Sequence, residues 1–453
     1  MKPLTEGIDN FITENLEAYI QATAQLCSQP SVSTQGEGML DCAQMVVQLF
    51  KEHDYHADLY PTPGNPVVIA RAQGQSERTL LFYNHYDVQP PEPLEMWTTP
   101  PFEPTIRDGA LYARGAKDDK GELVARLAAV DAVRSANNGD LPCGVLFVVE
   151  GEEEIGSPHI AQFVQEHLDL LTCHGAIWEE GNLNRDGRPY LPLGIRGLLY
   201  VELSVRTMKI DAHSGGAHYL PNAAWRLHWA LDTLKGKDER IRIPGFYDRI
   251  IPPSDLDLAY LDALPDHEAE TREQYGVQEF VRGLSGKELR RAVFEPTCNI
   301  AGLTAGYRGD GLKTVIPARA SAKVDFRLVP QQDPDVIFSN LRTYLDEQGF
   351  SDVKLTRLGA MWPFKMQADD PLVGLTACSG EEVYGKPSLI VPMWGGSSPI
   401  YAFAEPLGNI PVVRAGVGYW DNRTHAPNEH VRIEDFANAA RHIARILTGF
   451  GEL

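Results

Sequence analysis

The sequence is poor in cysteine and has no long apolar run. Its six cysteines are scattered along 453 residues, and no two of them form a C-x-x-C pair. This excludes a zinc knuckle or a dithiol redox motif and suits a reducing compartment. Residues 1–19 carry acids and lack the basic and apolar segments of a signal peptide, and no apolar run of about 18 residues could cross a membrane. We therefore predict a soluble, cytoplasmic protein.

Basic residues are also in deficit. Lys and Arg number 41 against 62 Asp and Glu, which gives a formal net charge of −21. Because an acidic chain repels phosphate backbones, nucleic acid is not an expected partner. The apolar fraction of 43% is typical of a globular protein, and the length is sufficient for two or three domains.

Short apolar segments alternate with helical patterns in the first part of the chain. The predicted strands are 67–71, 79–83, 144–149 and 175–178, and the predicted helices are 121–135 and 160–167. The helix over 121–135 places Leu123, Leu127 and Val130 on one face. Such alternation predicts a largely parallel sheet with helices on both faces.

The pattern changes near Gly194 and returns after Trp362. Segments 198–206, 320–328 and 353–358 are predicted strands, 222–234 and 335–348 are predicted helices, and 235–295 is interpreted as a charged insertion. After residue 361 we expect helices over 372–384 and 433–447 and strands over 388–391 and 411–414. We therefore predict an α/β domain, residues 1–195 and 361–453, interrupted by a small α+β domain, residues 196–360, with one open sheet face.

Residues capable of chemistry follow the predicted strands, at the edge of an α/β sheet where ligands bind. His85 and Asp87 come after the strand 79–83. A histidine there can bind a metal while a carboxylate fixes its tautomer, although it can also simply end the strand. Asp118 and Asp119 lie between glycines at a strand-to-helix turn, where they can point into a cleft or cap the helix.

Three further loops add candidate ligands. Four acids lie between Glu150 and Glu154, Glu179 and Glu180 follow the strand 175–178, and His425 lies in a loop with Pro and Asn. Crowded acids are costly unless cations compensate them or the loop is solvated. Two histidines with three or more carboxylates suit Zn²⁺, Mn²⁺ or Co²⁺. Two ions about 3.5–4 Å apart need a bridging carboxylate, terminal ligands and a water, and this set can supply the ligands.

The order of these motifs resembles the M20 metallopeptidase family, from about residue 10 to residue 447. The resemblance rests on three motifs: His85-x-Asp87, Gly115-x-x-Asp118-Asp119-Lys120-Gly121 and Glu153-Glu154-x-Gly156-Ser157. Segments 313–317, 327–330 and 395–399 are most similar to the branch of cytosolic nonspecific dipeptidases and carnosinases. The resemblance implies an α/β zinc-peptidase-like catalytic domain interrupted by a lid and dimerisation domain. It also implies a cis peptide after the first aspartate of the pair.

The resemblance further implies a role for each motif residue in the catalytic domain. One ion would be held by His85, Asp118 and Glu179, and the other by Asp118, Glu154 and His425. Asp118 would thus bridge both ions. Asp87 would orient His85, and Glu153 would be the general base. Related dipeptidases often have Asp where Glu179 stands, and the adjacent Glu180 stays open as the alternative. Glu179 is preferred because it directly follows the predicted strand.

In the middle domain, His213 matches a family element that reaches the partner subunit's active site and stabilises the oxyanion, which implies a homodimer. Its alternative is a histidine in a glycine turn. Arg327 would bind the substrate carboxylate, a task that suits a guanidinium, and Gly395, Gly396 and Ser397 would donate to the same group. The alternative for Arg327 is a surface arginine, and the alternative for the segment with Gly395 and Gly396 is a plain glycine turn.

We therefore predict a dinuclear, zinc-type hydrolase that cleaves the amide bond of dipeptides or short peptides with a free C-terminal carboxylate. Glu153 would take a proton from water and pass it to the leaving amine. An N-acyl-amino-acid deacylase or desuccinylase would use the same metals and is the alternative within hydrolases. A catalytically silent binding or scaffold protein is the alternative of another class. A serine hydrolase is disfavoured because the Gly-x-Ser-x-Gly elbow is missing around Ser397.

Overall fold

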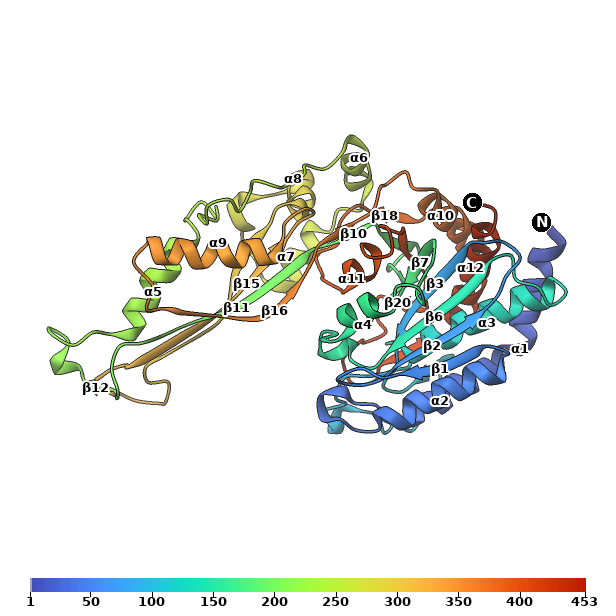
Figure 1. Ribbon diagram of the computed structural model, residues 1–453, viewed down its shortest axis with the longest axis horizontal. Helices are drawn as coiled ribbons and strands as arrows, with labels where there is room; N and C mark the ends of the chain where they lie inside the picture. The colour runs from blue at the N-terminus through green and yellow to red at the C-terminus, as the bar shows by residue number, and fades with distance from the viewer. Residues whose placement is uncertain (1) are drawn as a thin grey trace. The chain divides into compact units, whose positions relative to one another are not determined.

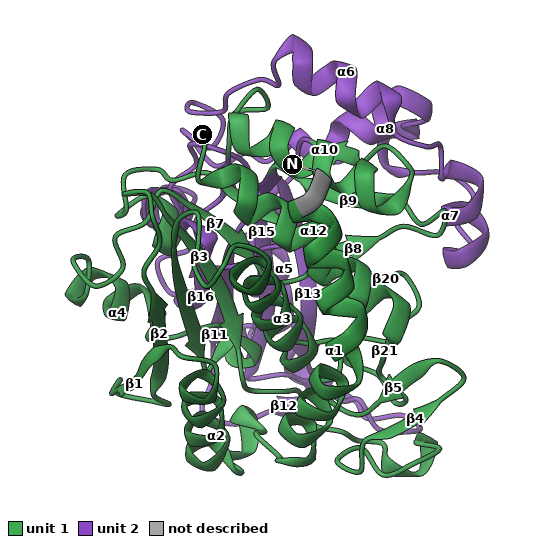
Figure 2. Ribbon diagram, turned by 90° about the vertical axis from the view of Figure 1, so that its right-hand side faces the viewer, with its two compact units in different colours: residues 1–193, 366–391, 402–453 green, residues 194–365, 392–401 purple. Residues whose placement is uncertain are grey.

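The computed structural model describes residues 2–453, which form two compact units (Figures 1 and 2). Unit 1 consists of the described residues up to Leu193, Met366–Val391 and Ala402–Leu453, and unit 2 of Gly194–Lys365 and Pro392–Tyr401. The sequence pattern predicted residues 392–401 as part of the C-terminal segment of the α/β domain. These residues group with unit 2 because the backbone N–H of Trp394 donates to the carbonyl of Gly194, and that of Arg196 to the carbonyl of Gly396.

Unit 1 is built on a six-stranded sheet (Figure 1). Its strand order is β1 (His56–Tyr60), β2 (Val67–Ala72), β6 (Gly144–Glu150), β3 (Thr79–His85), β7 (Gly175–Trp178) and β19 (Val412–Arg414). Strands β6, β3, β7 and β19 are parallel, whereas β1 and β2 pair antiparallel. The predicted mixed, mostly parallel sheet is confirmed, and its central strands are buried along almost their whole length.

The helices of unit 1 pack against this sheet and against one another. They are α1 (Lys2–Ser28), α2 (Met39–Glu52), α3 (Lys120–Ala136), α4 (Ile160–Glu166), α10 (Pro371–Tyr384) and α12 (Ile433–Phe450), while α11 (Ile400–Ala404) crosses the boundary between the units. Helix α3 contacts α1, α12 and β3, so it is covered on more than one side. The prediction of a single buried face with Leu123, Leu127 and Val130 was therefore too narrow, because every residue from Lys120 to Val130 is buried.

Two smaller sheets complete unit 1. One contains β21 (His430–Arg432), β5 (Ala110–Tyr112) and β4 (Thr105–Arg107), and the other β18 (Leu389–Val391), β9 (Pro189–Pro192), β8 (Asn182–Leu183) and β20 (Gly418–Tyr419). Pairing of β21 with β5 brings the loop before β21, which contains His425, beside the turn that leads into α3. Two segments far apart in the chain thus meet beside the start of α3, where the backbone N–H of Asp118 donates to Glu429, 311 residues later.

Unit 2 has a four-stranded antiparallel sheet covered on one face. Its order is β13 (Thr297–Ala305), β15 (Arg319–Leu328), β11 (Gly197–Arg206) and β16 (Lys354–Met361). Helices α5 (Ala223–Leu234) and α9 (Pro334–Glu347) pack on it. Alternate residues of β11 are buried and partly exposed, which confirms the predicted open face. Short pairs join β10 (Gly194–Ile195) to β17 (Phe364–Lys365) and β12 (Ala212–His213) to β14 (Val315–Ile316).

The charged segment 235–295 contains three short α-helices after a stretch without helix at 235–254. It contains α6 (Asp255–Ala263), α7 (Glu268–Tyr275) and α8 (Gly286–Arg291), and a small apolar cluster joins Leu261 and Phe294 to Met393. Within residues 2–453 no helix combines the length and apolar character required to traverse a bilayer. All six cysteines are free thiols.

Candidate metal centre

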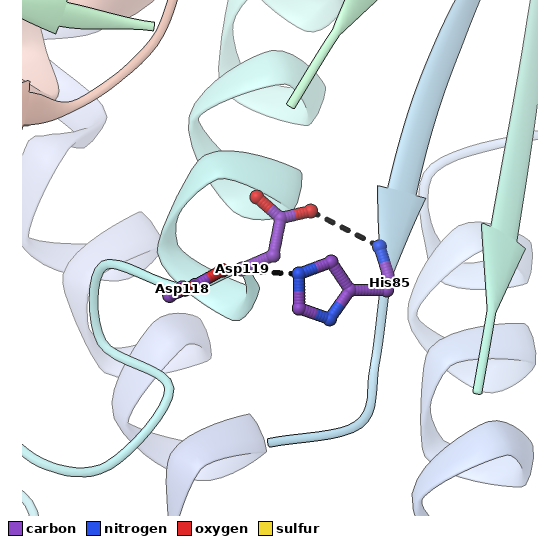
Figure 3. A group of neighbouring side chains, drawn as sticks. All are labelled: His85, Asp118 and Asp119. Carbon is purple, nitrogen blue, oxygen red and sulfur yellow. Dashed lines mark hydrogen bonds and ion pairs between the residues drawn. The ribbon is translucent and has the colours of Figure 1, made fainter. Parts of the chain in front are cut away.

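The first part of the site forms where β3 ends and α3 begins (Figure 3). His85 is the last residue of β3, and only 1% of it is exposed. Its Nε2 lies 3.0 Å from Oδ1 of Asp118, and its Nδ1 lies 3.4 Å from Oδ1 of Asp87. The peptide between Asp118 and Asp119 is cis, as the family resemblance implied. One ring nitrogen of His85 thus faces a candidate ligand, while the other lies 3.0 Å from the backbone carbonyl of Asp87 and close to its buried carboxylate.

Asp87 also holds the acidic loop that follows β6. Its carboxylate oxygens accept the backbone N–H of Glu153 at 3.2 Å and that of Glu154 at 3.0 Å. Asp87 therefore joins the histidine at the end of β3 to the short helical turn at Glu153–Ile155. This arrangement is consistent with an orienting role.

The second part of the site contains His425 and Glu154. Nε2 of His425 lies 3.0 Å from Oδ2 of Asp118 and 3.2 Å from Oε2 of Glu154. Asp118 thus directs one carboxylate oxygen to each histidine, which is the geometry a bridging carboxylate requires. Gln89 donates to Oε2 of Glu154 at 2.9 Å and fixes its direction.

Glu179 and Glu180 are adjacent but differ in their partners. Glu179 is 3% exposed; its Oε1 accepts from the indole N–H of Trp178 at 3.0 Å, and its buried Oε2 has no hydrogen-bond partner. Glu180 lies 3.6 Å from Nζ of Lys117 and 3.2 Å from Nη1 of Arg414. The charge of Glu180 is therefore compensated, whereas Glu179 keeps a buried oxygen open for a ligand.

The titration of these groups reflects uncompensated negative charge. Hydrogen bonds to Asp118 and Glu154 raise the pKa of His425 to about 10. Burial, followed by the nearby acids, raises the pKa of Glu153 to about 8 and that of Glu179 well above its usual range. Buried acids with open oxygens around two histidines are costly unless cations share the site.

This donor set fits divalent cations. The candidate ligands form two groups, and within each group the ligand atoms all lie within 4.8 Å of one another. One group is His85, Asp118 and Asp119, and the other is Asp118, Glu154 and His425. Asp118 belongs to both groups. Imidazole nitrogens and carboxylate oxygens suit zinc, manganese or cobalt.

Glu429 and Asp119 have roles in the site that the sequence did not predict. Glu429 is fully buried; its Oε1 accepts the backbone N–H of Asp118 at 3.0 Å, and its Oε2 accepts from Arg114 at 2.6 Å. Asp119 makes no side-chain cap of α3. Its Oδ2 instead accepts the backbone N–H of His85 at 3.1 Å. Only the closeness of Glu429 to His425 in sequence hinted at its role.

Glu152, which precedes Glu153 in the acidic loop, has its partners outside the candidate ligand set. Its Oε2 lies 2.6 Å from Nδ1 of His159, and its Oε1 accepts the backbone N–H of Asn65 at 3.2 Å. It thus joins the acidic loop to the segment before β2.

The remaining predicted residues belong to unit 2. His213 is exposed; its Nδ1 accepts from the backbone N–H of Gly215 at 3.0 Å, and its Nε2 lies 3.2 Å from Oγ1 of Thr314. Arg327 donates to Oγ of Ser397 at 2.7 Å, so the structure brings these two predicted substrate residues together. Gly395 and Gly396 stand in the same loop, where Gly396 accepts from Arg196 through its carbonyl.

Comparison with known proteins agrees with this geometry. The family model described as peptidase family M20/M25/M40 matches residues 81–449. Beta-Ala-His dipeptidase from Homo sapiens is 26% identical over 408 residues, which cover 86% of this chain and 78% of that protein. A Cys-Gly metallodipeptidase from Schizosaccharomyces pombe is 26% identical over 471 residues, covering 96% of each chain.

A solved structure is similar over almost the whole chain. An M20 family metallo-carboxypeptidase from Sulfolobus solfataricus has a TM-score of 0.90 and 34% identity, with 96% of this chain and 99% of that chain covered. The fold and site define a metal-dependent hydrolase of the α/β class. More narrowly, the chain belongs to peptidase family M20/M25/M40 and is a peptidase.

Proposed function

We propose that the protein cleaves dipeptides or short peptides with a free C-terminal carboxylate, using two divalent cations, with Zn²⁺ as the preferred metal. The observation that carries this proposal is the position of Asp118, with one carboxylate oxygen 3.0 Å from each of two histidines. The dipeptidase names of the relatives support the substrate class. His85, Asp118 and Glu179 would hold one ion, and Asp118, Glu154 and His425 the other.

The cations would supply Lewis acidity and lower the pKa of a water towards neutrality. Glu153 takes the proton from this water and then delivers it to the leaving amine nitrogen. Asp87 keeps the tautomer of His85.

Arg327, with Ser397 and the backbone at Gly395 and Gly396, would bind the substrate carboxylate. No hydrogen bond or ion pair joins Arg327 to a carboxylate among residues 2–453, so its guanidinium is free to bind one. His213 would stabilise the oxyanion in the partner subunit of a homodimer. A cytoplasmic location stays a prediction, in keeping with six free thiols.

The central test uses protein stripped of metal and reloaded with Zn²⁺, Mn²⁺ or Co²⁺. Turnover is measured on dipeptides, their C-terminal amides and N-acyl amino acids. We expect metal-dependent cleavage of free dipeptides and little cleavage of the amides. Equal activity without metal would contradict the metal role, and preference for N-acyl amino acids would contradict the peptide substrate.

The role of His213 in trans is tested by mixing two inactive variants, E153Q and H213A. If His213 serves the partner's site, each mixed dimer regains one complete site, and random exchange restores about a quarter of wild-type activity. Absence of restored activity in exchanged dimers would contradict the role in trans.

A further inference from the structure

The guanidinium of Arg126 contacts the ends of two strands that carry predicted ligands. Arg126 lies on α3 and is fully buried. Its Nη1 donates to the carbonyl of Tyr83 on β3, and its Nη2 donates to the carbonyl of Trp178 on β7 at 2.6 Å. Tyr83 stands two residues before His85, and Trp178 directly before Glu179.

Strands β3 and β7 stop pairing at this point. Their parallel register runs from Leu80–Gly175 to Phe82–Ile177 and is not continued by the next pair, Tyr83 and Trp178. The rings of that pair stack instead, with centroids 3.7 Å apart. Where this ladder ends, Arg126 donates to the carbonyls of both residues, and hydrogen bonds to buried carbonyls stabilise the local arrangement.

A second link runs from Arg126 through Asn84. Nη1 also donates to Oδ1 of Asn84 at 2.9 Å. Because a guanidinium can only donate, the Asn84 atom that faces it is the oxygen, and the amide nitrogen is left to Asp119. That nitrogen donates to Oδ2 of Asp119 at 2.6 Å, and the same oxygen accepts the backbone N–H of His85 at 3.1 Å.

We propose that Arg126 is a positioning residue for one of the two cations. It holds the end of β3 and the end of β7 in one arrangement, and so preorganises His85 and Glu179, the ligands that the second ion does not share. The inference rests on the proposed function, since it assumes an ion at these ligands. Partners that orient ligands in this way typically change metal affinity by about 10–100-fold.

The contacts of Arg126 are confined to this half of the site. Its other acceptors are the carbonyl of Ile177 and the carboxylate of Glu122, four residues earlier on the same helix. Among the described residues, none of its hydrogen bonds reaches Glu154 or His425. The second ion therefore depends much less on Arg126 than the first.

The experiment compares R126Q and R126K with R134Q in the full-length protein. Arg134 lies on the same helix and donates to the carbonyl of His53 at 2.9 Å, away from the ligand-bearing segments. Folded, metal-free proteins are titrated with Zn²⁺ in competition with a chromophoric chelator. We expect two ions in wild type and in R134Q at the same affinities. In R126Q, one ion keeps wild-type affinity and the other binds at least tenfold more weakly.

The R126K variant shows whether Arg126 acts on metal affinity through its position or only through its positive charge. A lysine keeps the positive charge but presents a single nitrogen that cannot bridge both strands, so we expect weakened binding of the same ion. Wild-type affinity for both ions in folded R126Q or R126K overturns the inference, as does an equal loss for both ions. If R126Q does not fold, the two metal affinities of R126K test the inference in the same way. A wild-type protein that binds no ion contradicts the proposed function itself.

Discussion

The metal centre of unit 1 and the arginine pair of unit 2 are opposite in charge. In unit 1, acids outnumber bases around Asp118, and a buried oxygen of Glu179 has no partner. In unit 2, Arg196 and Arg327 have no hydrogen-bonded or ion-paired carboxylate among residues 2–453. Burial and the charge of Arg327 lower the pKa of Arg196 to about 10.

This comparison indicates what each cluster can bind. Uncompensated buried charge destabilises a fold, and a bound ligand of the opposite sign removes that cost. The acidic cluster thus matches cations, and the arginine pair matches a carboxylate. Four tests would break or sharpen this contrast.

The largest expected effect comes from Glu153→Gln in the acidic cluster. The variant cannot transfer a proton, so we expect kcat to fall by roughly 10³-fold, about 4 kcal/mol. Both ions should remain, because Glu153 is not among the predicted ligands. Metal content and steady-state kinetics are the measurements. Turnover at the wild-type rate would reject its role as base.

The buried His442 provides the next contrast. Burial lowers the pKa of His442 to about 4, whereas the acids around His425 raise its pKa to about 10. Because the unfolded chain takes up a proton near pH 6.5 and the folded chain does not, stability is full above that pH. It falls as the pH drops towards 4, by about 3 kcal/mol.

Denaturant unfolding between pH 7 and pH 4 measures this dependence. Nε2 of His442 lies 2.9 Å from the carbonyl of Thr376, a contact that the amide of H442Q can retain without titrating. We expect a smaller loss of stability at low pH in H442Q. Identical pH profiles for the two proteins would contradict the assigned pKa.

Glu179→Gln and Glu180→Gln form a matched pair of neighbours. We expect E179Q to bind one ion about 10–100-fold more weakly. E180Q should keep both ions but lose stability, because Lys117 and Arg414 lose their partner carboxylate. Chelator competition and thermal melts distinguish the two. The reverse pattern would make Glu180 the ligand.

The smallest expected effect is that of Arg327→Lys in unit 2. Loss of the planar guanidinium should lower kcat/KM for free dipeptides by about tenfold, mainly through KM. Cleavage of a C-terminal amide, which lacks the carboxylate, should change little. An equal loss on both substrates would argue against carboxylate recognition.

The predictable part of the fold lay in its periodic segments. The strands β2, β3, β6 and β7 and the helices α3, α5 and α9 were predicted to within a few residues because they are short apolar runs or repeat with helical spacing. The edge strand β13 was missed, since most of its side chains are exposed and its apolar pattern is weak.

By itself, the sequence determined which residue types stand at the strand ends, and hence that His85, Asp118, Glu154 and His425 are candidate ligands. This was possible because chemistry and strand patterns are both local. Tertiary structure alone decided that Lys117 and Arg414 compensate Glu180, and that Glu429 and Arg126 support the ligand-bearing segments. These contacts join residues far apart in the chain, and no local spacing predicts which buried charges will meet.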